Sequence, residues 1–138
     1  MNILLVEDND VDAMMFDRAL RDARSDNTVV RARDGVEALE VLNQQDPPFA
    51  AGAPFVVLLD INMPRMNGHE FLQELRADDR ISLVTVVVVT TSSDQGDIER
   101  AYERHASGYL VKPSRKSEMT RVIDCLTDYW DRCERPLH

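Results

Sequence analysis

Residues 55–60 read FVVLLD, so five consecutive apolar side chains are followed at once by an aspartate, Asp60. A short apolar run that ends this abruptly is typical of a strand buried on both faces, as the strands of parallel sheets are. Runs of the same kind occur at residues 3–6, which read ILLV, and at residues 84–89, which read VTVVVV. The run at 84–89 is the most β-branched in the chain, and we expect it at the centre of a sheet.

The segments on either side of these runs carry apolar residues at helical spacing. Residues 11–24 place six apolar side chains on one stripe, those of Val11, Met15, Phe16, Ala19, Leu20 and Ala23. Further strands are predicted at 28–32 and 109–111, and further helices from residue 36, around 71–75, at 97–105 and along 119–133. Five strands thus alternate with five helices. This order predicts an α/β fold, a doubly wound five-stranded parallel sheet with helices on both faces.

Length and charge limit what the chain can be. Residues 1–138 suit one domain with a single core, a short tail at 131–138 and no separate effector domain. The 16 basic and 25 acidic residues give a net charge of −9, which repels nucleic-acid phosphates and anionic lipid, so we expect neither nucleic-acid nor membrane binding. No apolar run approaches the roughly 20 residues that span a bilayer, and no basic signal region opens the chain, which predicts a cytoplasmic protein.

Cys125 and Cys133 lie about 12 Å apart along one predicted helix, too far for a disulfide.

Polar side chains stand at the ends of the predicted strands, where a doubly wound sheet forms its ligand site. They are Glu7, Asp8, Asp60, Thr90, Thr91 and Lys112. Carboxylates gathered at one edge repel one another unless a cation joins them, and ligand sets made only of oxygen select a hard ion such as Mg²⁺. A lysine and a threonine hydroxyl beside that ion provide the charge and the hydrogen bond that a phosphoryl group requires. The set therefore predicts phosphoryl transfer to a carboxylate.

Each of these residues also has an ordinary interpretation. A single acidic residue after a strand is more often solvated than functional, and only the joint placement of the three acids favours a site. The threonines could end a strand, Lys112 could be a surface charge, and Tyr109 could be a half-buried core aromatic. His69 and His105 have no partner at metal-binding spacing, so we expect both at the surface, and we expect Gly68 to serve a turn.

In this order, the residues resemble the receiver domain of two-component response regulators, a family whose single-domain archetype is the chemotaxis regulator. The resemblance extends from Ile3 to about Trp130. The segments that match the family are LLVEDN at 4–9, RDGVEAL at 33–39, LDINMPRMNG at 59–68, TTSS at 90–93 and GYLVKP at 108–113. Two residues depart from the family pattern, because Glu7 stands where many receivers have aspartate and Thr91 stands where a small residue is usual.

The resemblance implies a signalling protein that catalyses only its own phosphorylation and dephosphorylation. It implies Asp60 as the phosphoacceptor and a Mg²⁺ site formed by Glu7, Asp8, Asp60 and the backbone carbonyl of Asn62. It further implies that Thr90 binds the phosphoryl oxygens and that Lys112 pairs with the phosphate. Tyr109 matches the aromatic residue that turns inward when the threonine moves.

Some less specific motifs of the sequence are most similar to those of the single-domain receivers that partner bacterial phytochromes. This similarity implies a sensor histidine kinase of phytochrome type as partner. These motifs are the Glu-Asp-Asn start, the Thr-Thr-Ser run and the adjacent Tyr129 and Trp130. Those two aromatics lie about 100° apart around a helix, so both cannot point into the same core, and one of them is expected to face outward. An outward aromatic suits a two-fold contact. We therefore expect a homodimer through the helix at 97–105, the strand at 109–111 and the last helix.

Two other classes of function compete with this interpretation. A phosphohydrolase of the haloacid dehalogenase type also places an aspartate nucleophile at a strand end with threonine and lysine nearby. Such enzymes carry a second aspartate two residues later as general acid, where this chain has Asn62. A flavodoxin-type flavin carrier requires a Ser/Thr-rich phosphate loop after the first strand, where this chain has two carboxylates that would repel the flavin phosphate.

Overall fold

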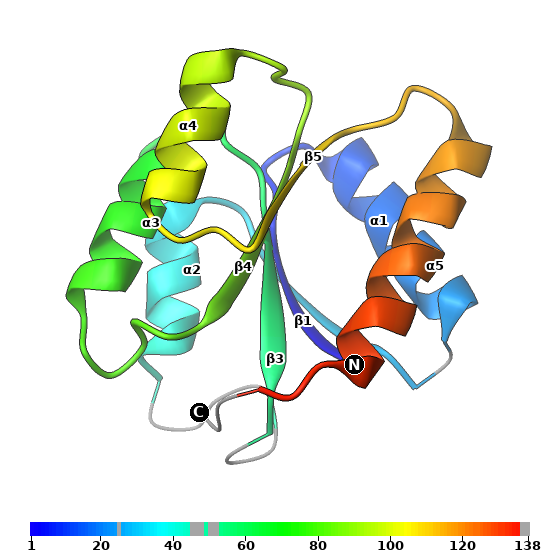
Figure 1. The fold of residues 1–138 in the computed structure, drawn as a ribbon, viewed down its shortest axis with the longest axis horizontal. Coiled ribbons are helices and arrows are strands. Elements are labelled where there is room, and N and C mark those ends of the chain that lie inside the picture. Colours follow the sequence, from blue (N-terminus) through cyan, green and yellow to red (C-terminus); the bar gives the residue numbers. More distant parts are fainter. Residues whose placement is uncertain (25, 45–48, 50–52, 136–138) are drawn as a thin grey trace.

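Five parallel strands form one sheet in the order β2-β1-β3-β4-β5 in the computed structural model, which describes residues 1–24, 26–44, 49 and 53–135. The strands of this described part are β1 Asn2–Val6, β2 Thr28–Ala32, β3 Phe55–Leu59, β4 Thr85–Thr90 and β5 Gly108–Val111. Its helices are α1 Asp10–Ala23, α2 Gly35–Leu42, α3 Gly68–Ala77, α4 Gln95–Glu103 and α5 Lys116–Arg132. The predicted α/β sheet and the alternation of its elements are confirmed (Figure 1).

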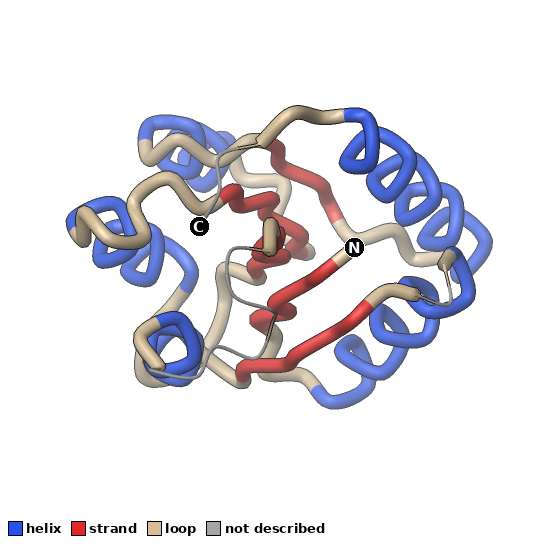
Figure 2. Tube along the Cα trace, turned by 90° about the horizontal axis from the view of Figure 1, so that it is seen from below, coloured by secondary structure: helices blue, strands red, loops and turns tan. Residues whose placement is uncertain are grey.

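Side chains that alternate along the interior strands build two cores, one on each face of the sheet. Leu4 and Val6 of β1 belong to the core under α2, α3 and α4, whereas Ile3 and Leu5 belong to the core under α1 and α5. Figure 2 shows the sheet with helices on both sides. Because β1, β3 and β4 are covered on both faces, their sequences are continuously apolar rather than alternating.

The centre of the sheet is β3 and not the run at residues 84–89, which we expected there. β4 lies between β3 and the edge strand β5. Both positions are buried on both faces, so the apolar content of a strand does not distinguish the middle of the sheet from its neighbour. Two element ends also differ from the prediction. α4 begins at Gln95, and not at residue 97, because the Asp94 side chain accepts the Asp97 N–H at 3.1 Å. α5 begins at Lys116, and not at residue 119, and ends at Arg132. The expected tail therefore starts after residue 132, and residues 136–138 lie outside the described part.

The buried stripe of α1 is narrower than the sequence predicts. Its buried residues are Ala13, Phe16, Ala19 and Leu20. Val11 and Met15, which we expected in the core, are exposed, as is Met14. The helix meets the sheet along one line of contact, and Val11 and Met15 lie on its flank beyond that line. Together with Met119 of α5, they line a shallow hollow of about 320 Å³.

The two aromatics of α5 diverge as predicted. Trp130 is buried in the core under α1 and α5, whereas Tyr129 is 70% exposed. Cys125 and Cys133 are both free thiols, in agreement with the prediction that they form no disulfide. None of the described helices combines the length and the apolar character that crossing a bilayer requires.

Candidate functional site

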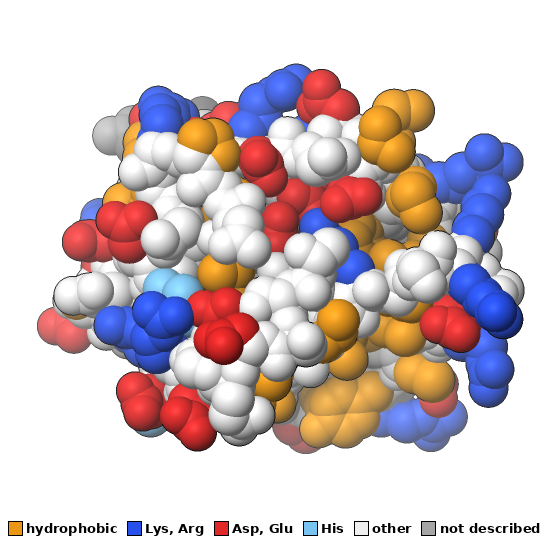
Figure 3. Space-filling model, turned by 90° about the horizontal axis from the view of Figure 1, so that it is seen from above, with side chains coloured by type: hydrophobic (Ala, Val, Ile, Leu, Met, Phe, Trp, Pro, Cys, Tyr) orange, Lys and Arg blue, Asp and Glu red, His pale blue; other side chains and the backbone are white. Residues whose placement is uncertain are grey.

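The carboxyl ends of the strands bring the predicted polar residues to one edge of the sheet. The parallel register aligns Val6 with Leu59, so Glu7 and Asp60 follow β1 and β3 at the same level. Leu59 is aligned with Val88, and β4 continues from there to Thr90 at the same edge of the sheet. Figure 3 looks onto this edge and shows acidic side chains gathered around its middle, with basic side chains beside them. We call this edge the rim, and define it by Glu7, Asp8, Asp60, Thr90 and Lys112.

Three carboxylates of the rim lie close enough to share one cation. Glu7, Asp8 and Asp60 each offer an oxygen within 4.8 Å of the others. Glu7 is 1% exposed and Asp60 7% exposed, so two of the three charges are shielded from water. The sheet itself holds them in place, since the Asp60 N–H donates to the Val6 carbonyl at 3.0 Å and the Glu7 N–H to the Ala32 carbonyl at 3.0 Å. This set of oxygen donors fits a hard divalent ion such as Mg²⁺.

Burial changes the protonation of this cluster. Burial and, to a lesser extent, the neighbouring Asp60 together raise the pKa of Glu7 from 4.5 to about 7, against the opposing effect of Lys112. The Asp60 carboxylate accepts the backbone N–H of Ile61 at 2.8 Å, which orients one of its oxygens and leaves the other toward Lys112. In the absence of a cation, Glu7 therefore binds a proton near neutral pH.

Lys112 is the cation that the side chains of the rim share. Its Nζ donates to Glu7 Oε1, to Asp12 Oδ2 at 2.9 Å and to Asp60 Oδ2 at 3.5 Å, and its side chain is 8% exposed. Burial alone would lower the pKa of Lys112, but the hydrogen bonds to Glu7 and Asp12 and the charge of Asp60 raise it above its ordinary value. Its backbone N–H also donates to the Thr90 carbonyl at 2.7 Å, which ties the end of β5 to the end of β4.

Asp12 is a residue of this site that the sequence analysis missed. The spacing of α1 places it outside the apolar stripe, where an acidic residue is ordinarily solvated. The signal that could have found it is its position in the first turn of a helix that starts at the rim, directly after Glu7 and Asp8.

The threonine and the tyrosine predicted to switch are connected through Ser92. Thr90 is fully buried at the end of β4, and its Oγ1 lies 3.5 Å from the Ser92 N–H. The Tyr109 hydroxyl donates to the Ser92 carbonyl at 2.8 Å. Burial raises the pKa of Tyr109, so this hydroxyl remains protonated as a donor at neutral pH. The loop after β4 is therefore held between β4 and the side chain of Tyr109, while Thr91 is exposed.

His69 is buried, which corrects the expectation that it lies at the surface. It is the second residue of α3, and its Nε2 lies 2.9 Å from Asp97 Oδ1 in the first turn of α4. Asp97 also accepts the Ser92 hydroxyl at 2.6 Å, and the hydrogen bonds from Ser92 and His69 hold the pKa of Asp97 below its ordinary value. The packing of α3 against α4 buries this histidine, which neither composition nor spacing indicates. His105 is exposed as expected.

Gly68 packs against the backbone of Asp60 and Ile61, rather than only serving a turn. A Cβ at this position would lie 2.5 Å from the Asp60 carbonyl oxygen and 2.8 Å from the Ile61 Cα. The Gly68 N–H donates to the Ile61 carbonyl at 2.8 Å. Only glycine allows α3 to start this close to the loop after β3. Asn62 is exposed on the same loop, and the role of its carbonyl as a ligand remains a prediction.

The sequence and fold match known proteins along nearly the whole chain. A family model described as "Response regulator receiver domain" matches residues 3–124. A probable methanogenesis regulatory protein, FilR2, from Methanothrix harundinacea is 36% identical over 128 residues, 93% of this chain and 82% of FilR2. Response regulator Rcp1 from Synechocystis is 31% identical over 128 residues, 93% of this chain and 87% of Rcp1.

Two solved structures have the same fold. A phosphorylated cyanobacterial phytochrome response regulator, RcpA, superimposes with a TM-score of 0.87 at 32% identity, covering 98% of this chain and 97% of RcpA. An Mn²⁺-bound form of Rcp1 superimposes with a TM-score of 0.84 at 29% identity, covering 98% of each chain.

Proposed function

Because this chain belongs to the response regulator receiver family, we propose that it accepts a phosphoryl group on Asp60 from a sensor histidine kinase and signals through protein contacts. The observation that carries this proposal is the convergence of a buried lysine and three carboxylates on one edge of the sheet. An aspartate in that position has a cation beside it and two further carboxylates with which to hold a metal.

The transfer requires only this aspartate as nucleophile. A carboxylate oxygen of Asp60 attacks the phosphorus of the donor phosphohistidine, so a P–O bond forms, the P–N bond breaks and the imidazole leaves, taking up a proton from solvent. Glu7, Asp8 and Asp60, with the carbonyl of Asn62, would hold Mg²⁺, which when bound offsets the negative charge of the reacting groups. Lys112 then pairs with the phosphoryl oxygens. That the homologue Rcp1 has an Mn²⁺-bound form supports the binding of a divalent cation by this protein.

The family match over residues 3–124 favours this function over the two competing ones. It does not support a haloacid dehalogenase-type phosphohydrolase, and Asn62 cannot serve as the general acid that such an enzyme requires two residues after its nucleophile. Glu7 and Asp8 after β1 would repel the phosphate of a flavin, which argues against a flavin carrier.

We infer that the loop after β4 transmits the phosphorylated state. Thr90 is at the rim. A hydrogen bond from its hydroxyl to a phosphoryl oxygen on Asp60 would draw the loop toward Asp60. Ser92 would move with it, and the 2.8 Å hydrogen bond from Tyr109 to its carbonyl would break. Tyr109 is then released to turn inward, which changes the surface that α4 and β5 present.

The partner we propose is a histidine kinase of phytochrome type, because the homologue RcpA is named as a phytochrome response regulator. The exposed apolar side chains of α1 support a docking face for it. Val11, Met14 and Met15 stand on the helix that starts at the rim, so a protein that docks there can reach Asp60. An apolar patch exposed beside a site is typical of protein interfaces.

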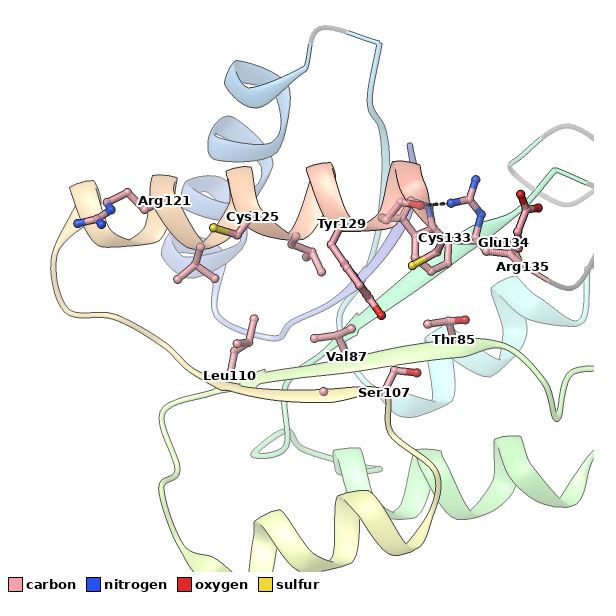
Figure 4. A pocket seen from close by; sticks show the side chains of 14 residues that line it. Thr85, Val87, Ser107, Leu110, Arg121, Cys125, Tyr129, Cys133, Glu134 and Arg135 are labelled. Carbon is pink, nitrogen blue, oxygen red and sulfur yellow. Dashed lines mark hydrogen bonds between the residues drawn. The ribbon is translucent and has the colours of Figure 1, made fainter.

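We also propose that the protein forms a homodimer through α4, β5 and α5. The exposed Tyr129 borders a groove of about 640 Å³ between α5 and the β4–β5 edge of the sheet. Figure 4 shows the Tyr129 side chain reaching from α5 toward these strands. At one end of the groove, the Arg135 guanidinium lies 4.5 Å from the centre of the Trp130 ring. A two-fold contact would use Tyr129 twice, once from each copy.

Label transfer tests the proposed function. The unaltered protein should take up phosphate from acetyl phosphate and from one member of a panel of autophosphorylated kinases, whereas Asp60→Asn should take up none. Met14→Glu should slow transfer from the kinase while leaving acetyl phosphate uptake unchanged. Leu83→Glu, an equally exposed apolar position, is the control and should change neither. Label retained by Asp60→Asn would identify another acceptor.

Sedimentation tests the homodimer. The unaltered protein should be a dimer at tens of micromolar, Tyr129→Ala should shift it toward monomer, and Leu83→Ala should have no effect. A monomeric unaltered protein, phosphorylated or not, would refute the proposed dimer.

A further inference from the structure

We propose that Asp12 is a positioning residue for Lys112, which it holds beside Asp60 while the metal and the phosphoryl group engage the other carboxylates. This inference rests on the proposed function. Asp12 Oδ2 accepts from Lys112 Nζ at 2.9 Å, a shorter contact than the 3.5 Å between Lys112 and Asp60.

The backbone around Asp12 fixes its place at the rim. Asn9 caps α1, and its side-chain oxygen accepts the Asp12 N–H at 3.0 Å. Asp12 thus belongs to an ordered first turn of α1. The partial positive charge of the N-terminal helix end also favours an acidic side chain there. Its side chain is 35% exposed, against 8% for Lys112, so Asp12 reaches the lysine from the solvent side.

Asp12 differs from the other partners of Lys112 because it lies outside the group suited to a cation. Lys112 contacts Glu7, Asp12 and Asp60, and two of these belong with Asp8 to the set of oxygens within 4.8 Å. A divalent cation bound there would be held by the carboxylates of Glu7 and Asp60 and would repel the Lys112 ammonium. Of the three carboxylates that contact Lys112 in the described structure, only that of Asp12 would not also bind the cation. Its full negative charge therefore remains available to the lysine.

The hydrogen-bonding capacity of the lysine permits both interactions at once. An ammonium has three N–H donors, so one can remain on Asp12 while another is given to a phosphoryl oxygen. An ammonium anchored in this way loses less side-chain freedom when the phosphoryl group arrives. Asp12 therefore acts on the reaction through Lys112 and does not touch the reacting atoms.

The matched control is Asp10, which lies in the same first turn of α1 and carries the same charge. It pairs with Arg31 at 2.8 Å and with Arg33 at 3.2 Å instead of with Lys112. A loss of helix-end charge affects both positions alike, whereas a loss of lysine positioning affects only Asp12.

The experiment measures the apparent affinity for beryllofluoride at saturating Mg²⁺, with NMR shifts as the readout, and the rate of phosphorylation by acetyl phosphate. Asp12→Ala should lower both by about fivefold to tenfold, the usual effect of a charged hydrogen bond discounted for partial exposure. Asp12→Asn keeps an acceptor oxygen but loses the charge, so its loss should be smaller than that of Asp12→Ala, whereas Asp10→Ala should stay within about twofold of the unaltered protein. In a Lys112→Ala background, Asp12→Ala should add less than about twofold.

Several outcomes among the variants would overturn the proposal. One is an equal loss from Asp12→Ala with and without Lys112, and another is a loss from Asp12→Asn as large as that from Asp12→Ala. A gain in affinity from both Asp12 variants would also overturn it, because it would mean that the charge of Asp12 only repels the anion. If the unaltered protein itself binds no beryllofluoride, the proposed function fails and this inference fails with it. Normal binding by the unaltered protein with unchanged binding by Asp12→Ala refutes this inference alone.

Discussion

Replacing Asp60 by asparagine should stabilise the metal-free protein, although it removes the proposed phosphoacceptor. Glu7 and Asp8 each lie within 4.8 Å of Asp60, and at an effective dielectric constant near 20 each repels it by at least about 3.5 kcal/mol when ionised. Lys112 at 3.5 Å attracts it by about 5 kcal/mol on the same scale. Asparagine retains an oxygen that can accept the Ile61 N–H. Allowing for solvent screening, the free energy of unfolding should rise by about 1 to 2 kcal/mol, roughly 3 to 8 °C in melting temperature.

The assay is urea and thermal unfolding at pH 8 in EDTA, where Glu7 is ionised because its pKa is about 7. The experiment is repeated with Mg²⁺ at ten times its dissociation constant, which should stabilise the unaltered protein by about 1.4 kcal/mol and the variant by less. The gap between the two proteins should therefore narrow in Mg²⁺. Asp79→Asn makes the same chemical change at an exposed position away from the rim and should alter stability by less than about 0.5 kcal/mol. An Asp60→Asn protein no more stable than the unaltered one in EDTA would refute the account of the rim as a cluster of repelling charges.

Three further predictions concern the groups around Asp60. The folded metal-free protein binds a proton on Glu7 that the unfolded chain releases above pH 4.5, so its free energy of unfolding in EDTA should fall as pH rises from about 4.5 to 7, and Glu7→Gln should abolish that fall. A slope of the opposite sign would show that the folded protein holds Glu7 ionised. Thr90→Ala should remove the beryllofluoride-linked NMR shifts of Tyr109 while leaving Mg²⁺ binding intact, and shifts that persist would exclude Thr90 as the link. His69→Ala should cost about 1 to 2 kcal/mol in urea unfolding, because Asp97 loses a partly buried hydrogen bond, without changing Mg²⁺ affinity. A stability equal to that of the unaltered protein would mean that this hydrogen bond contributes nothing.

Local patterns in the sequence were enough to predict the fold and the members of the rim. Runs such as FVVLLD at 55–60 identify buried parallel strands from composition alone, since only a strand covered on both faces is apolar at every position. The residues directly after such strands meet at one edge by the geometry of any parallel sheet. For this reason, Glu7, Asp8, Asp60 and Lys112 could be placed together without coordinates.

The partners of individual side chains depended on how helices pack, which local patterns do not contain. Asp12 and Val11 are neighbours on α1, yet Asp12 reaches Lys112 and Val11 is exposed, because the line along which α1 meets the sheet is set by its contacts with β1, β3 and α5. His69 is buried only because α3 and α4 bring it against Asp97, 28 residues away. Strand composition likewise could not order β3 and β4, since both are covered on both faces and burial is the same for each. The sequence by itself determined which elements form and which residues stand at the rim, whereas only the tertiary structure decided which charges meet, because ion pairing depends on distances of a few ångströms between residues far apart in the chain.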